Sequence, residues 1–379
     1  MFEYLETGEY FAQTAGSMEE FAARELKEFG AKNIKTAYRG VFFTTDKEKL
    51  YRIVYQSKLL SHILAPLMKF SCHDTKYLYK RAMEIEWDSL LTTNQTFAIS
   101  AKVANSNISH SKYAALKLKD AIADYFYEAQ NKRPDVDKHN PDLLFHLYIH
   151  NNFATIYVDV AGFSLHKRGY RIESVEAPMQ ETLAAAIIKI SGWNGKTKLI
   201  DPMCGSGTLL SEALMSYSRI PTGFKRENYS FQYLPDYDKN IWEKIRAKSK
   251  SLVRELPKDL IYGNDILRSA VRATATNLDS IPYGKNVVLS SKHFEDLPNL
   301  ENHTIITNPP YGIRLENKEK VKVLYKNFGD FLKNKCVNSK AYIYFGDRSL
   351  IKYIGLKPSQ KIPLVSGQLD GRLAVFDIY

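Results

Sequence analysis

Residues 307–312 read Thr-Asn-Pro-Pro-Tyr-Gly and follow a short apolar run at 303–306 that is typical of a buried strand. The prolines end that strand because neither can donate a backbone N–H, and they hold the preceding Asn308 extended. The side-chain oxygen of Asn308 and the carbonyls beside it would then accept from one N–H donor, which leaves the lone pair of an amine available for attack. A proline-rich turn with a surface tyrosine is the alternative. The candidate catalytic residues are Asn308, Pro309, Pro310 and Tyr311.

Residues 199–210 read Leu-Ile-Asp-Pro-Met-Cys-Gly-Ser-Gly-Thr-Leu-Leu, a strand end that leads through a Gly-rich turn into a helix. Gly205 and Gly207 allow positive φ and close backbone approach, and the helix start offers free N–H groups to a carboxylate. ATP and NAD are disfavoured because the turn lacks a Gly-Lys-Ser/Thr ending, and Leu210 replaces the third glycine of a dinucleotide motif. Together with Asn-Pro-Pro-Tyr, the turn resembles the S-adenosylmethionine site of class I amino-methyltransferases. The predicted cofactor-binding residues are Thr182, Asp201, Met203, Cys204, Gly205, Ser206, Gly207, Thr208 and Asn308.

Two further strand ends could complete the cofactor site. Asp265, at the end of the second predicted strand, should bind the ribose hydroxyls. It follows the Gly-rich turn by about sixty residues because a charged segment at 217–258 is inserted, where we expect one or two extra helices. His293 and Phe294 follow the third strand and should flank the adenine, with Phe294 packing on the ring. An acid is often used at this place, so Asp296 is the alternative.

Length and composition exclude several classes of protein. The chain has 379 residues, 44% of them hydrophobic, which is enough for two or three domains with their own cores. No apolar run of about 18 residues predicts a membrane helix, and residues 1–10 lack the apolar segment of a secretory signal. Cys72, Cys204 and Cys336 show no zinc-ligand spacing, so we expect no metal. These features favour the cytoplasm.

The positive charge lies in the C-terminal part of the chain. The net charge is +11, yet residues 1–160 hold 20 basic and 20 acidic side chains, and the remainder holds 33 and 22. A basic catalytic domain suits a polyanionic substrate such as RNA, and a merely soluble basic surface is the alternative.

Residues 1–162 are predicted to form two α+β domains. The first, at 1–56, has a ferredoxin-like pattern, with helices at 18–29 and 46–56 around a hairpin at 33–44. The second has an apolar, partly helical stretch at 57–70, strands at 95–103, 143–150 and 154–160, and a helix at 111–130. That helix carries Lys112, Lys117 and Lys119, which could bind RNA phosphates; a solvated helix face is the alternative.

A basic linker at 162–171 precedes the last domain. Its cationic and aromatic side chains fit a hinge that contacts phosphates, and a plain linker is the alternative. The residues concerned are His166, Lys167, Arg168, Tyr170 and Arg171. Arg314, just past the Asn-Pro-Pro-Tyr motif, could hold another phosphate.

Strands and helices alternate in residues 163–379, which predicts a doubly wound α/β sheet. The predicted strands are 198–201, 260–264, 286–290, 303–307, 340–346 and 373–378. The predicted helices are 178–191, 237–256, 265–280 and 318–335. Segments 361–365 and 372–379 are expected to form a terminal antiparallel hairpin, which is usual in class I methyltransferase sheets. Ligands bind such sheets outside the carboxyl ends of the strands, where both motifs fall.

The chain, from about residue 5 onward, resembles the bacterial RlmL/YpsC-like family of guanine-N2 RNA methyltransferases. The matching segments are 113–123, 165–171 (LHKRGYR), 181–185 (ETLAA), 201–210, 263–266 and 307–315 (TNPPYGIRL). This family combines a ferredoxin-like domain, a THUMP RNA-binding domain and a Rossmann-like methyltransferase domain. The resemblance therefore implies domains at 1–56, 57–162 and 163–379.

The resemblance also implies methyl transfer from S-adenosylmethionine to the exocyclic N2 of a guanosine, with the THUMP domain holding structured RNA. Large-subunit 23S ribosomal RNA is favoured, and tRNA stays open because THUMP-containing archaeal and thermophile relatives act on tRNA. Adenine N6 or a protein glutamine also stays open, as does a non-enzymatic RNA-binding or assembly factor. We expect the chain to lack the second, fused methyltransferase of longer enterobacterial relatives. The sequence does not predict an oligomeric state.

Overall fold

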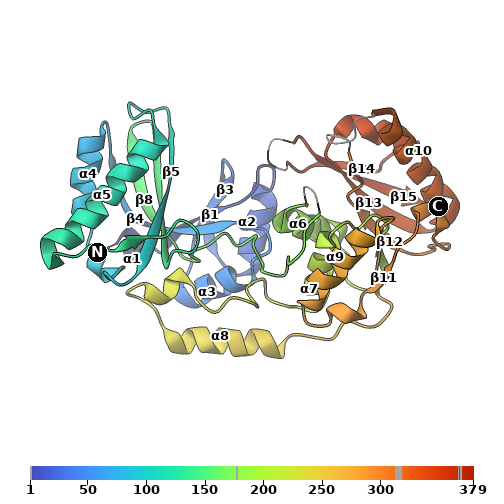
Figure 1. The fold of residues 1–379 in the computed structure, drawn as a ribbon, viewed down its shortest axis with the longest axis horizontal. Coiled ribbons are helices and arrows are strands. Elements are labelled where there is room, and N and C mark those ends of the chain that lie inside the picture. The colour runs from blue at the N-terminus through green and yellow to red at the C-terminus, as the bar shows by residue number, and fades with distance from the viewer. Residues whose placement is uncertain (1, 176–177, 312–317, 366, 368) are drawn as a thin grey trace. The chain divides into compact units, whose positions relative to one another are not determined.

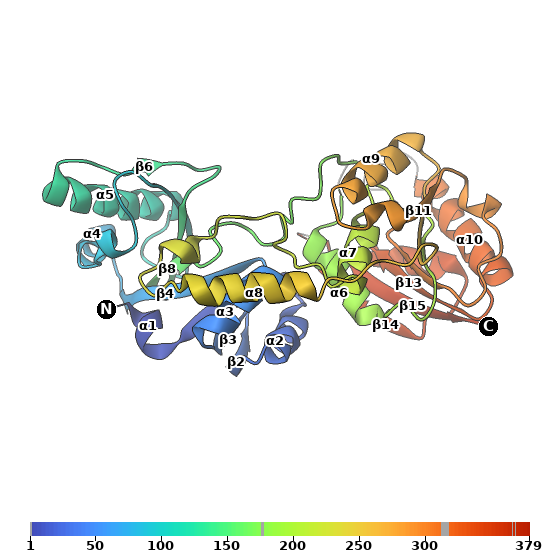
Figure 2. The ribbon, with the colours of Figure 1, turned by 90° about the horizontal axis from the view of Figure 1, so that it is seen from below.

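The computed structural model describes the chain except residues 1, 176–177, 312–317, 366 and 368 (Figures 1 and 2). The chain forms two compact units. The N-terminal unit comprises residues 1–14, 22–165 and 226–246, and the C-terminal unit comprises residues 15–21, 166–225 and 247–379.

One eight-stranded sheet runs through the N-terminal unit in the order β2-β3-β1-β4-β8-β7-β5-β6. Its strands are β1 (Glu9–Gln13), β2 (Lys32–Ala37), β3 (Gly40–Thr44), β4 (His62–Ser71), β5 (Thr96–Ala104), β6 (Asp135–Val136), β7 (Leu143–His150) and β8 (Phe153–Asp159). The two predicted α+β domains share this sheet, because β4 pairs with β1 on one edge and with β8 on the other. The partly helical conformation predicted for residues 57–70 is wrong for β4, where strand partners on both edges fix an extended backbone.

Helices cover the N-terminal sheet. They are α1 (Glu3–Thr7), α2 (Glu19–Glu28), α3 (Lys47–Gln56), α4 (Thr75–Met83) and α5 (Ser111–Gln130), with a 3₁₀ turn at Trp87–Ser89. Each of α3 and α4 begins at an aspartate whose side chain accepts from the backbone N–H three residues on, Asp46 at 2.9 Å and Asp74 at 2.8 Å. Trp87, Phe97 and Phe145 are fully buried in the core beneath them.

The segment 226–246 packs in the N-terminal unit although it lies between strands of the second sheet in sequence. It contains a 3₁₀ turn (Ser230–Tyr233) and the first part of α8 (Lys239–Ser251). The Phe231 ring stacks on Tyr51 at 4.4 Å, and Trp242 meets Tyr55 edge-on at 5.2 Å. The extra helix predicted within residues 217–258 is therefore confirmed, and aromatic packing anchors this insertion.

The C-terminal unit holds a seven-stranded sheet in the order β11-β10-β9-β12-β13-β15-β14. Its strands are β9 (Leu199–Asp201), β10 (Ile261–Asn264), β11 (Val288–Ser290), β12 (Thr304–Thr307), β13 (Ser339–Phe345), β14 (Gln360–Pro363) and β15 (Arg372–Ile378). The pairs from β11 to β13 are parallel, and β15 pairs antiparallel with β13 and β14. This confirms the predicted doubly wound sheet with its terminal hairpin.

Helices lie on both faces of this sheet, with α6, α7 and α9 on one side and α10 on the other (Figures 1 and 2). Their bounds are α6 (Glu181–Ser191), α7 (Thr208–Tyr217), α9 (Arg268–Asp279) and α10 (Lys318–Lys335), with 3₁₀ helices at Gly284–Asn286, Phe294–Asp296 and Arg348–Ile354. On the α10 side, Tyr325 and Phe328 pack with strand residues such as Ile305 in one apolar cluster. Among the described helices none is long and apolar enough to span a bilayer.

Candidate cofactor and acceptor site

Three strand ends meet at one edge of the C-terminal sheet. β9 pairs in parallel with β10 on one side and with β12 on the other. Asp201 ends β9, Asp265 follows β10 and Asn308 follows β12, so these residues stand at the carboxyl ends of adjacent strands. The strand order changes direction at β9, and α/β sheets bind ligands at such a switch point.

The Gly-rich turn is bound to its neighbours through its backbone. The N–H of Gly205 donates to Asp265 Oδ2 at 2.9 Å, and the Gly205 carbonyl accepts from Thr274 Oγ1 at 2.7 Å. Gly207 has a φ of +77°, and a Cβ added there would lie 2.7 Å from the Thr274 methyl group. Only glycine suits that position. No side chain caps α7 at Gly207, so the first N–H groups of the helix are available to an anion.

The other predicted cofactor residues are distributed around this turn. Thr182, Cys204, Ser206 and Thr208 are buried, while Met203 is half-buried. Burial raises the pKa of the Cys204 thiol, which disfavours the thiolate. Asp265 also accepts from the Leu267 N–H at 3.0 Å, so it is fixed beside the turn. Their assignment to cofactor binding stays a prediction.

The adenine contact predicted for Phe294 is not supported by its position. Its ring is buried and meets Phe328 and Phe331 edge-on at 5.4 and 5.6 Å, so it belongs to the apolar core on the α10 side. The neighbouring His293 is more exposed, and its Nδ1 lies 3.2 Å from the carboxylate of Glu295. His293, with Asp296 as the alternative, stays a predicted contact of the adenine.

Asp201 is a buried carboxyl at the centre of the sheet edge. Its Oδ1 accepts from the Met203 N–H at 3.1 Å. Burial, with a smaller contribution from the charge of Asp265, raises the pKa of Asp201 to about 7. The group therefore changes its charge near neutral pH.

The Asn-Pro-Pro-Tyr segment ends β12 beside Asp201. The side-chain oxygen of Asn308 is buried and accepts no hydrogen bond from any described residue. The Tyr311 ring lies against Gly346, where an added Cβ would come within 2.7–2.8 Å of three ring carbons. A buried acceptor without a donor is costly by about 1–3 kcal/mol, so it suits a ligand that brings an N–H. Gly312 and Arg314 lie outside the described residues.

The structure corrects part of the predicted RNA surface. Arg168 and Tyr170 are buried, with about 1% of each residue exposed, and both contact Glu212: Tyr170 Oη donates at 3.0 Å and Arg168 Nε lies at 3.5 Å. They cannot contact phosphates because they face protein. Arg171 is half-buried and pairs with Glu181, and of this linker Lys167 alone among the predicted cations is exposed.

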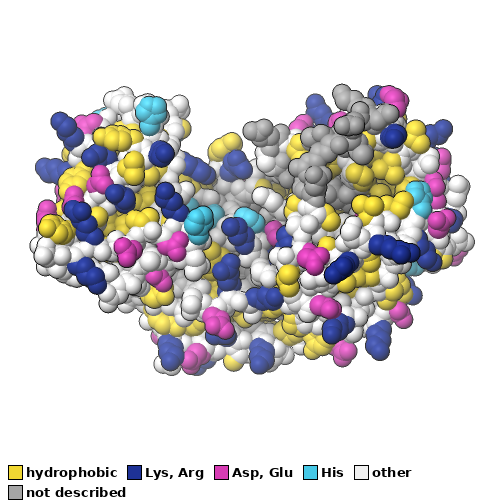
Figure 3. All heavy atoms as spheres, in the orientation of Figure 1, with side chains coloured by type: hydrophobic (Ala, Val, Ile, Leu, Met, Phe, Trp, Pro, Cys, Tyr) yellow, Lys and Arg dark blue, Asp and Glu magenta, His cyan; other side chains and the backbone are white. Residues whose placement is uncertain are grey.

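The α5 lysines remain near solvent. Lys112 is exposed, while Lys117 and Lys119 pair with Asp120 at 3.6 and 3.0 Å. Lys117 also lies over the ring of Tyr113, at 5.8 Å. Over the part of the N-terminal unit that carries α5, cationic side chains alternate with apolar ones (Figure 3). Such a surface is compatible with RNA, and the individual contacts stay predictions.

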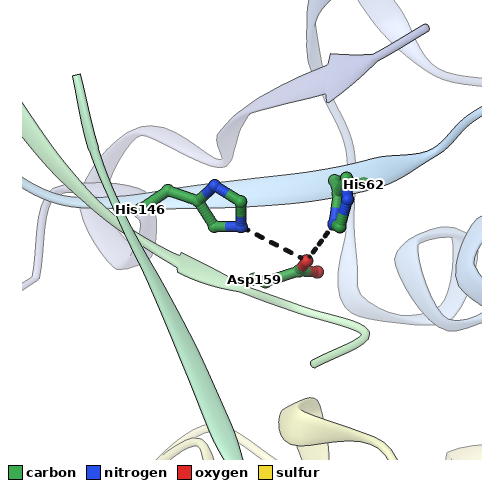
Figure 4. Close-up of side chains that lie close together, drawn as sticks. All are labelled: His62, His146 and Asp159. Atoms are coloured by element: carbon green, nitrogen blue, oxygen red, sulfur yellow. Dashed lines mark hydrogen bonds and ion pairs between the residues drawn. The ribbon is translucent and has the colours of Figure 1, made fainter. Parts of the chain in front are cut away.

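Among the described residues, one cluster of two histidines and an aspartate could hold a metal ion. We compare its distances with those expected of a zinc site. His62, His146 and Asp159 converge from β4, β7 and β8, respectively (Figure 4). The Nδ1 of His62 lies 2.5 Å from Asp159 Oδ2, and the Nε2 of His146 lies 3.6 Å from the same oxygen. Two ligands of a tetrahedral zinc ion would stand about 3.4 Å apart. We therefore interpret the 2.5 Å contact as a hydrogen bond.

Burial by itself would raise the pKa of Asp159, yet the adjacent imidazoles of His62 and His146 lower it to about 2. The carboxylate also accepts from the backbone N–H of Ala161 at 3.0 Å, just past the end of β8. The cluster thus joins three strands of the N-terminal sheet to the start of the linker.

Three family models match the chain. The RMKL-like methyltransferase domain covers residues 168–374, the THUMP domain covers 72–159, and the RlmL ferredoxin-like domain covers 9–64. Their order is the one that the motifs predict, which confirms the predicted fold class.

Similar proteins extend over nearly the whole chain. A Synechocystis protein described as an RNA methyltransferase is 34% identical over 374 residues, which is 98% of this chain and 97% of that protein. The ribosomal RNA large subunit methyltransferase K/L of Syntrophotalea carbinolica is 34% identical over 97% of this chain. Only 53% of that relative is covered, so this chain spans about half its length.

Two solved structures described as methyltransferases or methylases share this fold over nearly the whole chain. SMU.472, described as a methyltransferase and crystallised with S-adenosylhomocysteine, superposes with a TM-score of 0.87 at 25% identity, over 98% of each chain. A possible methylase from Clostridium difficile 630 gives a TM-score of 0.85 at 26% identity, again over 98% of each chain.

The raised pKa of Asp201 predicts a pH dependence of stability. An unfolded aspartate ionises near pH 3.8 and the folded one near 7, so the folded state keeps the extra proton between these values and loses stability as the pH rises. We expect wild type to lose up to about 1.4 kcal/mol per pH unit between pH 5 and 7 relative to Asp201→Asn. Urea unfolding of both proteins gives the difference curve, which should become flat above pH 7. Parallel curves would show an ordinary carboxyl pKa instead.

Proposed function

Because this chain belongs to the family of RMKL-like methyltransferases that carry THUMP and RlmL ferredoxin-like domains, we propose that it methylates the exocyclic N2 of a guanosine in structured RNA, using S-adenosylmethionine. Its RNA is 23S ribosomal RNA, as the names of the large-subunit relatives suggest. We place the reaction in the cytoplasm, where bacterial ribosomal subunits are assembled.

The buried oxygen of Asn308 is the observation that carries this proposal. Asn308 Oδ1 has no donor among the described residues, and the two prolines after it have no N–H to offer. An exocyclic amine supplies the missing donor. With one N–H held by Asn308 and the other directed at the Pro309 carbonyl, the nitrogen lone pair is oriented for attack, and alignment replaces a strong base.

The Gly-rich turn fits the cofactor through its backbone. The uncapped start of α7 would hold the carboxylate end, and Asp265 would hold the ribose, since both lie at the strand edge beside Asn308. Bound S-adenosylmethionine would supply the electrophilic methyl group. The N2 lone pair forms the new N–C bond while the S–C bond breaks, and the surplus proton leaves N2 for solvent.

The Tyr311 ring provides a stacking surface for the target base. A guanine inside a duplex cannot reach the strand edge, so the base has to leave its stack and lie on an aromatic face. Gly346 supports the other side of this ring with backbone alone. The long-range attraction of RNA comes from the excess of basic residues after residue 160.

Methyl transfer from radiolabelled S-adenosylmethionine tests the function. Unmodified 23S ribosomal RNA and total tRNA are offered separately, and the labelled nucleosides are identified. We expect N2-methylguanosine in 23S ribosomal RNA alone. Label only in tRNA would overturn the substrate, N6-methyladenosine would overturn the acceptor atom, and no label in RNA or in assembling ribosomal particles would overturn the enzymatic function.

Replacement of Asn308 should separate chemistry from cofactor binding. Asn308→Ala removes the acceptor that orients the amine, so we expect turnover to fall by about 10³-fold with nearly unchanged affinity for S-adenosylmethionine. Single-turnover rates and calorimetric titration measure the two effects. Retained turnover would contradict the role given to Asn308.

Gly346→Ala tests whether the position of the Tyr311 ring against Gly346 matters for turnover. The added methyl would press on three ring carbons, displacing the ring and the base on it, so we expect turnover to fall about tenfold or more while the cofactor affinity is kept. Gly16→Ala is a matched control, because a Cβ there meets nothing within 4 Å. Equal rates for both variants would show that the ring position is unimportant.

A further inference from the structure

Residues 170–173, which include the predicted RNA contacts Tyr170 and Arg171, are hydrogen-bonded to the Gly-rich turn. The side chain of Asn277 on α9 accepts from the N–H groups of Ile172 and Glu173 at 2.7 and 2.9 Å. The same amide donates to the carbonyls of Glu173 and Ser206 at 2.8 and 3.0 Å. All of its hydrogen-bonding capacity is used, and it joins this segment to the turn.

Arg171 reaches the turn with its side chain. Its Nη1 donates to Ser206 Oγ at 3.2 Å, its Nη2 to the Met179 carbonyl at 3.0 Å, and its Nε to Glu181 Oε1 at 3.0 Å. A guanidinium has five N–H donors, so two Nη donors have no acceptor among the described residues. About 17% of the side chain is exposed, which leaves room for a ligand.

The surroundings of Arg171 suit a zwitterion. Ser206 precedes Gly207, the N-cap residue of α7, and Glu181 is the first residue of α6. Among the described residues, no side chain caps either helix at Gly207 or Gln180. Free N–H groups and the guanidinium therefore favour a carboxylate. Glu181 adds a negative group beside them, with 9% of its side chain exposed.

We propose that Arg171 and Glu181 recognise the amino-acid end of S-adenosylmethionine, Arg171 through its carboxylate and Glu181 through its ammonium. The inference rests on the proposed function, since it assumes this cofactor. It assigns Arg171 to the cofactor rather than to RNA. The Arg171–Glu181 ion pair is neutral as a whole and matches a ligand end that is also neutral but carries both charges.

Binding of two ligands, one with and one without the carboxylate, distinguishes a direct contact of Arg171 with that group from a general distortion of the site. S-adenosylhomocysteine carries the carboxylate, and S-adenosyl-3-thiopropylamine lacks only that group. Calorimetric titration of the full chain, without RNA, should show that wild type prefers S-adenosylhomocysteine by about 10- to 100-fold, as expected for a hydrogen-bonded charge. In Arg171→Gln we expect this preference to fall to about threefold or less, with the affinity for the thiopropylamine unchanged.

Two control variants show whether the effect of Arg171→Gln is specific to the carboxylate. Lys167→Gln neutralises an exposed cation of the same linker and should change neither affinity. Asn277→Ala loosens the turn and should weaken both ligands equally. Equal weakening in Arg171→Gln, or an unchanged preference, would overturn the proposal. A wild type that binds both ligands without preference refutes this inference alone, whereas a wild type that binds neither refutes the cofactor of the proposed function.

Discussion

The parallel pairing of β9 with both β10 and β12 is the constraint on which the site depends. It places the residues after three strands at one edge, so a carboxyl, an acid beside the Gly-rich turn and an amide acceptor become neighbours although about a hundred residues separate the first from the last. A shift of register by one residue would move each side chain to the other face of the sheet. The apolar packing of α10 against β12 resists that shift.

The backbone of the Gly-rich turn and the side chain of Asn308 differ in whether protein groups satisfy their hydrogen bonds. The backbone groups of Gly205 and Ser206 have partners in Asp265, Thr274 and Asn277, so the turn holds its shape without a ligand. Asn308 lacks such a partner among the described residues. Folded proteins satisfy nearly all buried polar groups, and the exceptions gather where a ligand completes them. This contrast distinguishes the turn, which protein groups hold in place, from Asn308, the residue that we propose contacts the reacting amine.

Sequence predicts best what depends on the local backbone. The prolines after Asn308 and the glycines of the turn act through their own φ angles, and alternation in the last domain predicted all seven strands of its sheet except for small shifts at their ends. Residues 62–71 were less predictable, since pairing on both edges decides their conformation. Thr274 and Asn277 carry no local signal, because their partners in the turn lie 69 and 71 residues away.

The basic linker shows why its composition alone did not predict which cations face solvent and could contact RNA. A buried arginine is tolerated only when its charge is paired, and Arg168 with Glu212 and Arg171 with Glu181 meet that condition. Each pair cancels in the count of 33 basic and 22 acidic residues after residue 160, so the excess must come from other side chains. Exposed lysines of α8 such as Lys244, Lys248 and Lys250 contribute to it. The positive field of this part of the chain therefore arises from surface side chains, while Arg168 and Arg171 pair with carboxylates of α7 and α6.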